Sequence, residues 1–265
     1  MLRAFRSELP KFSRWMVLAG IPVMVAVTIG LPYFALSRAL TSTDTPIKNL
    51  PQILPTTQGL ITLLSFAQKF TVAVAVTMVA ANLAAEWSQG TLRNLLVREP
   101  GRLRWLWGKM LALLLFVILS TTLAIFISTG VILLLAGSYG ISTAPWLTLE
   151  GVGIFFLYLG NELLGLVGIS LLGMFIAVLT RSIGIAVGIS VAYVLIAEDL
   201  AQAVWKDGAT WLPVHLFDYL WGTESHFSMG VPPMGYGADL IVALLWMVGF
   251  VLVSAIAFRR MDINA

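Results

Sequence analysis

Long apolar runs separated by short polar segments dominate this chain. Six of the runs are long enough to span a hydrocarbon core, which takes about 20 helical residues. They lie near 15–37, 59–84, 110–136, 150–179, 182–200 and 239–258. The runs are continuous rather than alternating, which predicts helices and not the strands of a barrel. The pattern therefore predicts an all-α integral membrane protein in which residues 1–265 form a single transmembrane domain.

The composition supports this prediction. Apolar residues make up 59% of the chain and charged residues 11%, whereas soluble domains have about 25% charged residues. So few charges would not cover the surface of a soluble protein of this length. The chain has no cysteine, which excludes disulfides and thiolate metal sites. Its net charge of +3 is too small to indicate a nucleic-acid partner.

The positive charges are distributed unevenly between the two sides of the predicted membrane domain. With six spans both termini lie on one side, and the segments on that side hold twelve of the sixteen Lys and Arg residues. The twelve are Arg3, Arg6, Lys11, Arg14, Arg93, Arg98, Arg102, Arg104, Lys109, Arg181, Arg259 and Arg260. The positive-inside rule therefore predicts cytoplasmic N and C termini and a cytoplasmic loop between the second and third spans.

The first fourteen residues predict a short amphipathic helix. Leu2, Phe5, Leu9 and Phe12 fall on one side of a helical wheel and the basic residues fall on the other. Such a helix lies in the headgroup layer of a membrane. The alternative is a basic flank that only sets topology. The apolar run that follows is too long for the core of a signal peptide, so we expect it to be the first span.

The loop between the second and third spans has features that a loop with only basic residues does not need. Gly90-Thr91 interrupts the helix where the chain must turn along the membrane. Leu92, Leu95 and Leu96 then form an apolar patch with helical spacing, and Pro100 ends the short helix. We therefore expect a surface helix whose apolar side docks into a groove on a partner protein.

The same loop carries the spaced pattern Glu86-x3-Gly90-Thr91-Leu92-Arg93-x-Leu95-Leu96-x3-Pro100-x-Arg102. This pattern resembles the first cytoplasmic loop of type-2 ABC exporter permeases. In that family the loop contains a coupling helix, here within 86–102, and an amphipathic elbow, here 1–14, precedes the first span. The resemblance implies a permease of the prokaryotic plasma membrane that works as an identical or mixed dimer among membrane lipids.

The resemblance also implies two copies of a separate ABC ATPase subunit that sit on the coupling helices. This chain contains no Gly-x4-Gly-Lys-Ser/Thr segment for binding nucleotide phosphates. We therefore expect no cofactor and no enzymatic activity in this chain, and we assign ATP and Mg²⁺ to the partner ATPase. The cargo, whether lipid, peptide or drug-like molecule, does not follow from the pattern.

Two charged residues lie inside predicted spans at a similar depth, Lys69 in the second and Glu162 in the fourth. Each costs about 2.5–3.5 kcal/mol near the bilayer centre if it is unpaired. Their matched depth suggests an ion pair, or a polar lining of a transport path together with Gln68 and Asn161. In the alternative interpretation Lys69 snorkels outward and Glu162 faces a water-filled cleft with a structural role.

The turn Leu179-Thr180-Arg181-Ser182 joins the fourth and fifth spans and resembles a short hairpin of the same permease family. Gly184-x3-Gly188 follows it, a small-residue motif that predicts close helix packing. The resemblance covers the layout of nearly the whole chain, but its specific residues lie in the coupling loop and in this turn.

The segment 201–236 is rich in aromatic residues and predicts short helices at the membrane interface. It also holds His215, Asp218, Glu224 and His226, whose spacing matches no metal motif, so we predict no metal ligand. A membrane-embedded enzyme that uses these side chains is one alternative function. A secondary transporter or channel that uses Lys69 and Glu162 is another, although no internal repeats support it.

Overall fold

The computed structural model describes residues 19–41, 50–92, 101–205, 208–220 and 234–261. The long helices are α2 (Ile21–Thr41), α4 (Gly59–Ser88), α6 (Arg102–Ser138), α7 (Leu149–Thr180), α8 (Ile183–Ala192) and α11 (Tyr236–Arg260). The shorter ones are α3 (Leu50–Ile53), η2 (Ala144–Leu147), the π-helical turn η3 (Tyr193–Ala197), α9 (Glu198–Val204), η4 (Ala209–Trp211) and α10 (Pro213–Leu220). Six helical segments are long and apolar enough to cross a membrane, which confirms the predicted all-helical class.

The helices agree with the predicted spans at most of their ends. The fifth span is continuous through α8, η3 and α9 from Ile183 to Val204. The helix that contains the third predicted span begins before the apolar run near residue 110, because α6 starts at Arg102. Trp105 and Leu106 are buried in the core, so the apolar side of the helix continues through this charged stretch.

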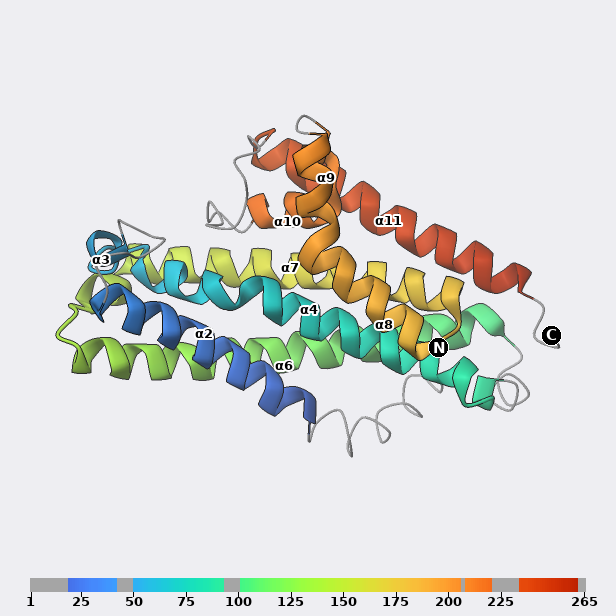
Figure 1. The fold of residues 1–265 in the computed structure, drawn as a ribbon, viewed down its shortest axis with the longest axis horizontal. Coiled ribbons are helices and arrows are strands. Elements are labelled where there is room, and N and C mark those ends of the chain that lie inside the picture. Colours follow the sequence, from blue (N-terminus) through green and yellow to red (C-terminus); the bar gives the residue numbers. More distant parts are fainter. Residues whose placement is uncertain (1–18, 42–49, 93–100, 206–207, 221–233, 262–265) are drawn as a thin grey trace.

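The bundle is built around α4. This helix contacts α2, α6, α7 and α8 (Figure 1). The helix α11 packs on α7, and α10 lies against both α7 and α11. Since α10 lies beside the middle of α7 rather than at its end (Figure 1), the chain after α9 returns into the bundle.

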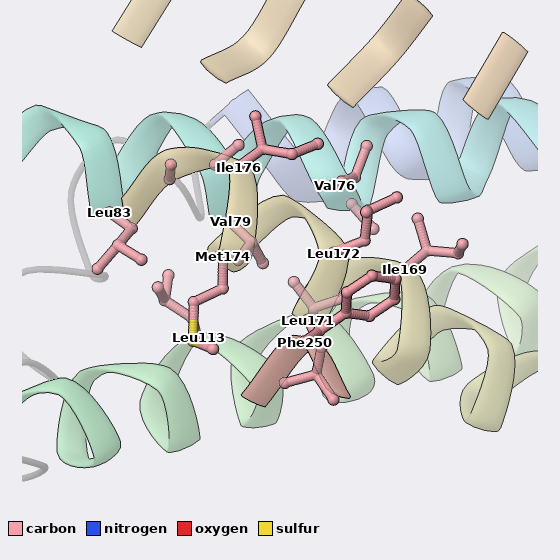
Figure 2. Close-up of a cluster of buried hydrophobic side chains, with 14 of the residues drawn as sticks. Val76, Val79, Leu83, Leu113, Ile169, Leu171, Leu172, Met174, Ile176 and Phe250 are labelled. Atoms are coloured by element: carbon pink, nitrogen blue, oxygen red, sulfur yellow. The ribbon is translucent and has the colours of Figure 1, made fainter. Parts of the chain in front are cut away.

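The core lies between α4, α6, α7 and α11. Figure 2 shows side chains from these helices meeting in one apolar cluster that includes Val76, Leu113, Ile169 and Phe250. Gly173 brings α7 close to α4, because a Cβ atom at this position would lie 2.6 Å from a methyl group of Val76.

Among the described residues, no side chain or backbone packs closely against the predicted Gly184-x3-Gly188 motif. A Cβ atom at either glycine would meet nothing within 4 Å, and both residues are exposed. Both glycines lie on an outward side of α8. Gly168 and Gly173 in the fourth span, by contrast, do lie against side chains of other helices.

Exposed arginines gather at one end of the bundle, which we call the arginine end. This is where α4, α7 and α11 end and where α6 and α8 begin (Figure 1). The exposed arginines there are Arg102, Arg104, Arg181, Arg259 and Arg260. The predicted elbow at 1–14 lies outside the described residues.

Candidate functional site

Glu86 and Lys109 form an ion pair at the base of the 89–101 loop. Glu86 lies in the last turn of α4, and not in the loop as predicted, while Lys109 lies in α6. The Glu86 carboxylate accepts hydrogen bonds from Nζ of Lys109 and from Oγ1 of Thr91. The Lys109 side chain is 2% exposed and the Glu86 side chain 11%. The pair therefore joins the end of α4 to the start of α6 inside the protein.

The chain turns at Gly90 after the end of α4, as the sequence predicted. Its φ of 66° lies in the left-handed region that favours glycine, and a new helical stretch begins at Thr91. Leu92 contradicts the prediction of an accessible apolar patch, because it is 5% exposed and belongs to the core of this chain. The other predicted coupling residues Arg93, Leu95, Leu96 and Pro100 lie outside the described residues.

An aromatic stack lies beside the ion pair. Nζ of Lys109 lies 5.7 Å from the ring centroid of Trp105, at a distance typical of a cation–π contact. Trp105 in turn stacks on Phe258 of α11, and Arg102 donates a hydrogen bond of 3.0 Å to the carbonyl oxygen of Met261. The base of the loop is thus bound to the end of α11 as well as to α4 and α6.

The four predicted path residues make separate contacts inside the bundle. Nε2 of Gln68 donates a hydrogen bond of 2.7 Å to Oε2 of Glu162, and both side chains are buried. Nζ of Lys69 lies 2.7 Å from Oδ2 of Asp199 on α9. The suggested ion pair between Lys69 and Glu162 is therefore wrong. Neighbouring helical residues point about 100° apart, so Gln68 faces α7 while Lys69 faces α9.

The fourth residue, Asn161, contacts the start of α11. The hydroxyl of Tyr236 donates a hydrogen bond of 3.0 Å to Oδ1 of Asn161. Together with Gln68–Glu162 and Lys69–Asp199, this contact links α4, α7, α9 and α11 at one level of the bundle. We call these six residues the polar network.

Glu198 of α9 caps the start of α10, where the chain returns into the bundle. Its carboxylate accepts the backbone N–H groups of Val214 at 3.0 Å and His215 at 2.9 Å, in the first turn of α10. A carboxylate there satisfies donors that a helix start leaves free and interacts well with the helix dipole. Sequence reasoning missed this role, because the cap lies far from α10 along the chain.

Phe217 shows that α10 is not an interfacial helix as predicted. Its side chain is fully buried, and a Cβ atom at Gly168 would lie 2.1 Å from its ring. Gly168 lies well inside α7, which ends at Thr180. The aromatic ring therefore enters the interior of the bundle.

Asp218, also on α10, is a buried acid without a hydrogen-bond partner among the described residues. It is 6% exposed, and burial raises its pKa to about 8. The positive charge of Lys69 opposes this shift, whereas Glu198, Asp199 and Glu162 add negative charge nearby. In the described part of the chain no three His, Asp or Glu side chains converge to hold a metal ion. Glu224 and His226 lie outside it.

Replacing Asp218 with asparagine is expected to reduce the pH dependence of stability. The folded protein keeps the proton of Asp218 up to about pH 8, whereas the unfolded chain releases it near the ordinary pKa of 3.8. The unfolding free energy therefore falls as the pH rises through this window. Thermal unfolding of the purified protein at pH 5 and pH 9 should show a smaller decrease for Asp218→Asn than for the wild type. An equal decrease in both would contradict the buried, protonated acid.

Comparison with known proteins gives one family. Residues 25–264 match a family described as a protein of unknown function (DUF2705). No curated protein matches the chain.

Proposed function

The chain belongs to the DUF2705 family, and we propose that it is the transmembrane permease subunit of an ATP-driven exporter. In this proposal the arginine end faces the cytoplasm, and a separate ABC ATPase binds the loop at 89–101. Two permease chains form the transport path across the membrane. Two ATPase subunits, which bind ATP and Mg²⁺, drive the transport. The cell membrane is the expected location.

The observation that carries the proposal is the buried Glu86–Lys109 ion pair. A loop that only connects two helices does not need a buried ion pair, a hydroxyl ligand and an aromatic stack at its base. These contacts fix both ends of the loop to α4, α6 and α11. A force that a partner applies to the loop is therefore transmitted to three helices of the bundle.

The helix α4 connects the loop base to the polar network. Glu86 lies in its last turn, whereas Gln68 and Lys69 contact α7 and α9 from the same helix. At about 1.5 Å per residue, these positions are roughly 27 Å apart along the helix axis. Closure of the ATPase dimer would tilt or shift α4, and the contacts with Glu162 and Asp199 would then rearrange. This gives a physical route from nucleotide binding to a change in the path.

A second candidate is a secondary transporter or channel, and the polar network is the observation that favours it. Carboxylates that pair with lysine and glutamine inside a membrane domain are typical of ion and proton pathways. A secondary transporter or channel would give no role to the buried Glu86–Lys109 ion pair at the base of the loop. We therefore prefer the permease.

The proposed orientation predicts which single cysteines react in intact cells. The chain has no cysteine of its own, so Gln89→Cys at the arginine end and Ser138→Cys at the other end serve as reporters. A membrane-impermeant maleimide should label Ser138→Cys in whole cells and Gln89→Cys only after the membrane is opened. The reverse pattern would place the arginine end outside and contradict the proposal.

Charge reversal at the arginine end is expected to weaken binding of the ATPase. Arg104 is exposed beside the loop. In the Arg104→Glu variant, an ATPase that binds there would meet a negative charge in place of a positive one. Capture of the ATPase by the tagged permease should fall several-fold in this variant. Arg38→Glu is the matched control, because Arg38 is exposed at the opposite end of the bundle. An equal effect of both reversals would contradict a contact at the loop.

A further inference from the structure

The start of α6 and the end of α11 meet at the arginine end of the bundle (Figure 1). Nη1 of Arg102 donates its hydrogen bond of 3.0 Å to the carbonyl oxygen of Met261, the residue that follows Arg260. One turn further into each helix, the ring of Trp105 stacks on Phe258 with the ring centroids 5.7 Å apart. These contacts hold the guanidinium group of Arg102 beside the end of α11.

Three arginines at this junction have no counter-charge among the described residues. Arg102, Arg259 and Arg260 are exposed, and neither ion pair of the described part of the chain involves them. Glu86 is the only acid that the described residues place at the arginine end, and Lys109 already neutralises it. Each guanidinium group has five N–H donors. The junction therefore offers positive charge and hydrogen-bond donors to an anion.

An exposed apolar stripe on α11 leads to these arginines. Leu245, Val248, Leu252 and Ile256 are 52% to 64% exposed and share one face of the helix. Arg259 follows Ile256 by three residues, so it continues the same face. From Leu245 to Ile256 the stripe is about 16 Å long, close to half of the hydrocarbon core of about 30 Å. The stripe thus spans one leaflet and ends in positive charge at the level of the head groups.

These features fit a ligand that has both an anionic phosphate group and acyl chains. Arginine binds phosphate oxygens through two parallel N–H donors, and basic sites between membrane helices bind the head groups of anionic lipids. A soluble phosphate compound would use the arginines but not the apolar stripe. A zwitterionic lipid would bring its own cation to the three guanidinium groups. An anionic phospholipid uses both features without that repulsion.

We propose that an anionic phospholipid binds where α6 meets α11, with its phosphate at Arg102, Arg259 and Arg260 and its acyl chains along the α11 stripe. The lipid joins the first turn of α6 to the last turn of α11. It therefore supports the base of the 89–101 loop, together with the stack of Trp105 on Phe258. This inference goes beyond the proposed permease function, because it depends on neither the ATPase nor the cargo.

The test is purification of the tagged chain in mild detergent that contains equal amounts of phosphatidylglycerol and phosphatidylcholine with the same acyl chains. Mass spectrometry then gives the ratio of the two lipids that stay bound after washing. Phosphatidylglycerol should be enriched at least about fivefold, the factor expected for one arginine near anionic lipid. The double variant Arg259→Gln, Arg260→Gln should bring the two lipids close to equal amounts. Because the ratio compares two lipids on the same protein, it does not depend on how much protein folds.

Two controls distinguish a lipid site from general attraction to a positive surface or to phosphate. Arg102→Gln is compared with Arg181→Gln, because each removes one exposed arginine from the same end of the bundle. Arg102→Gln should lower the ratio, whereas Arg181→Gln, in the turn between α7 and α8, should leave it unchanged. Glycerophosphoglycerol, which is the head group without acyl chains, should not displace the bound lipid when it is added in excess.

Three results would overturn the inference. Equal amounts of the two lipids on the wild-type protein would show no preference for an anionic lipid. Equal decreases in Arg102→Gln and Arg181→Gln would show only a general attraction between anionic lipid and positive charge. Displacement of the lipid by glycerophosphoglycerol would assign the arginines to a soluble phosphate compound.

Discussion

Replacing Lys109 with methionine is expected to destabilise the protein strongly and to release the loop at 89–101. The variant leaves the Glu86 carboxylate buried with the Thr91 hydroxyl but without its cation. Removing one partner of a buried ion pair typically costs about 3–5 kcal/mol, because the remaining charge is uncompensated. Thermal unfolding of the purified protein should show a clear decrease in midpoint, and ATP-driven transport should be lost.

The reciprocal and double variants test whether the effect belongs to the pair. Glu86→Gln alone should also destabilise, while Glu86→Gln combined with Lys109→Met should recover much of the loss, because no buried charge remains. Arg104→Met is the matched control, since this exposed cation lies on the same helix. Additive losses in the double variant would show that the two residues are not coupled.

Gly168→Leu is expected to displace α10 from the bundle. A Cβ atom at Gly168 would lie 2.1 Å from the Phe217 ring and 2.9 Å from the Met247 methyl group. The Phe217 ring is fully buried and has little room to move. Overpacking of a filled core costs about 1–3 kcal/mol, and a leucine at this contact should reach the upper end of that range. The thermal unfolding midpoint of the purified protein measures the loss.

Another glycine of α7 provides the control for this substitution. A Cβ atom at Gly160 would meet nothing within 4 Å, so Gly160→Leu should be neutral or slightly stabilising. Phe217→Ala should partly rescue Gly168→Leu, because it removes the ring that the new side chain meets. Equal effects at Gly160 and Gly168 would contradict the placement of α10 beside the middle of α7.

The six long helices could be predicted because the length of an apolar run is local information. The start of α6 could not, since Arg102, Arg104 and Lys109 are typical of a polar loop. Only the folded chain shows that Lys109 is neutralised by Glu86, which lies 23 residues earlier. The turn at Gly90 was predictable, because its chemistry depends on a single residue and its neighbours.

The polar network shows the limit of reasoning from depth along a span. Lys69 and Glu162 do lie inside the spans, but depth says nothing of the direction in which a side chain points. Gln68, one residue away, faces Glu162, and Lys69 faces Asp199. The cap of Glu198 on α10 and the contact of Phe217 with Gly168 also depend on how helices pack. No periodicity of a single segment contains that information.

The most direct test of the permease function is purification of the tagged chain from native membranes in mild detergent, followed by mass spectrometry of the bound proteins. We expect a stoichiometric ABC ATPase that is lost when Leu95 and Leu96 in the loop are replaced by glutamate. A folded, monodisperse protein that carries no ATPase would contradict the account and favour a transporter that works through the polar network.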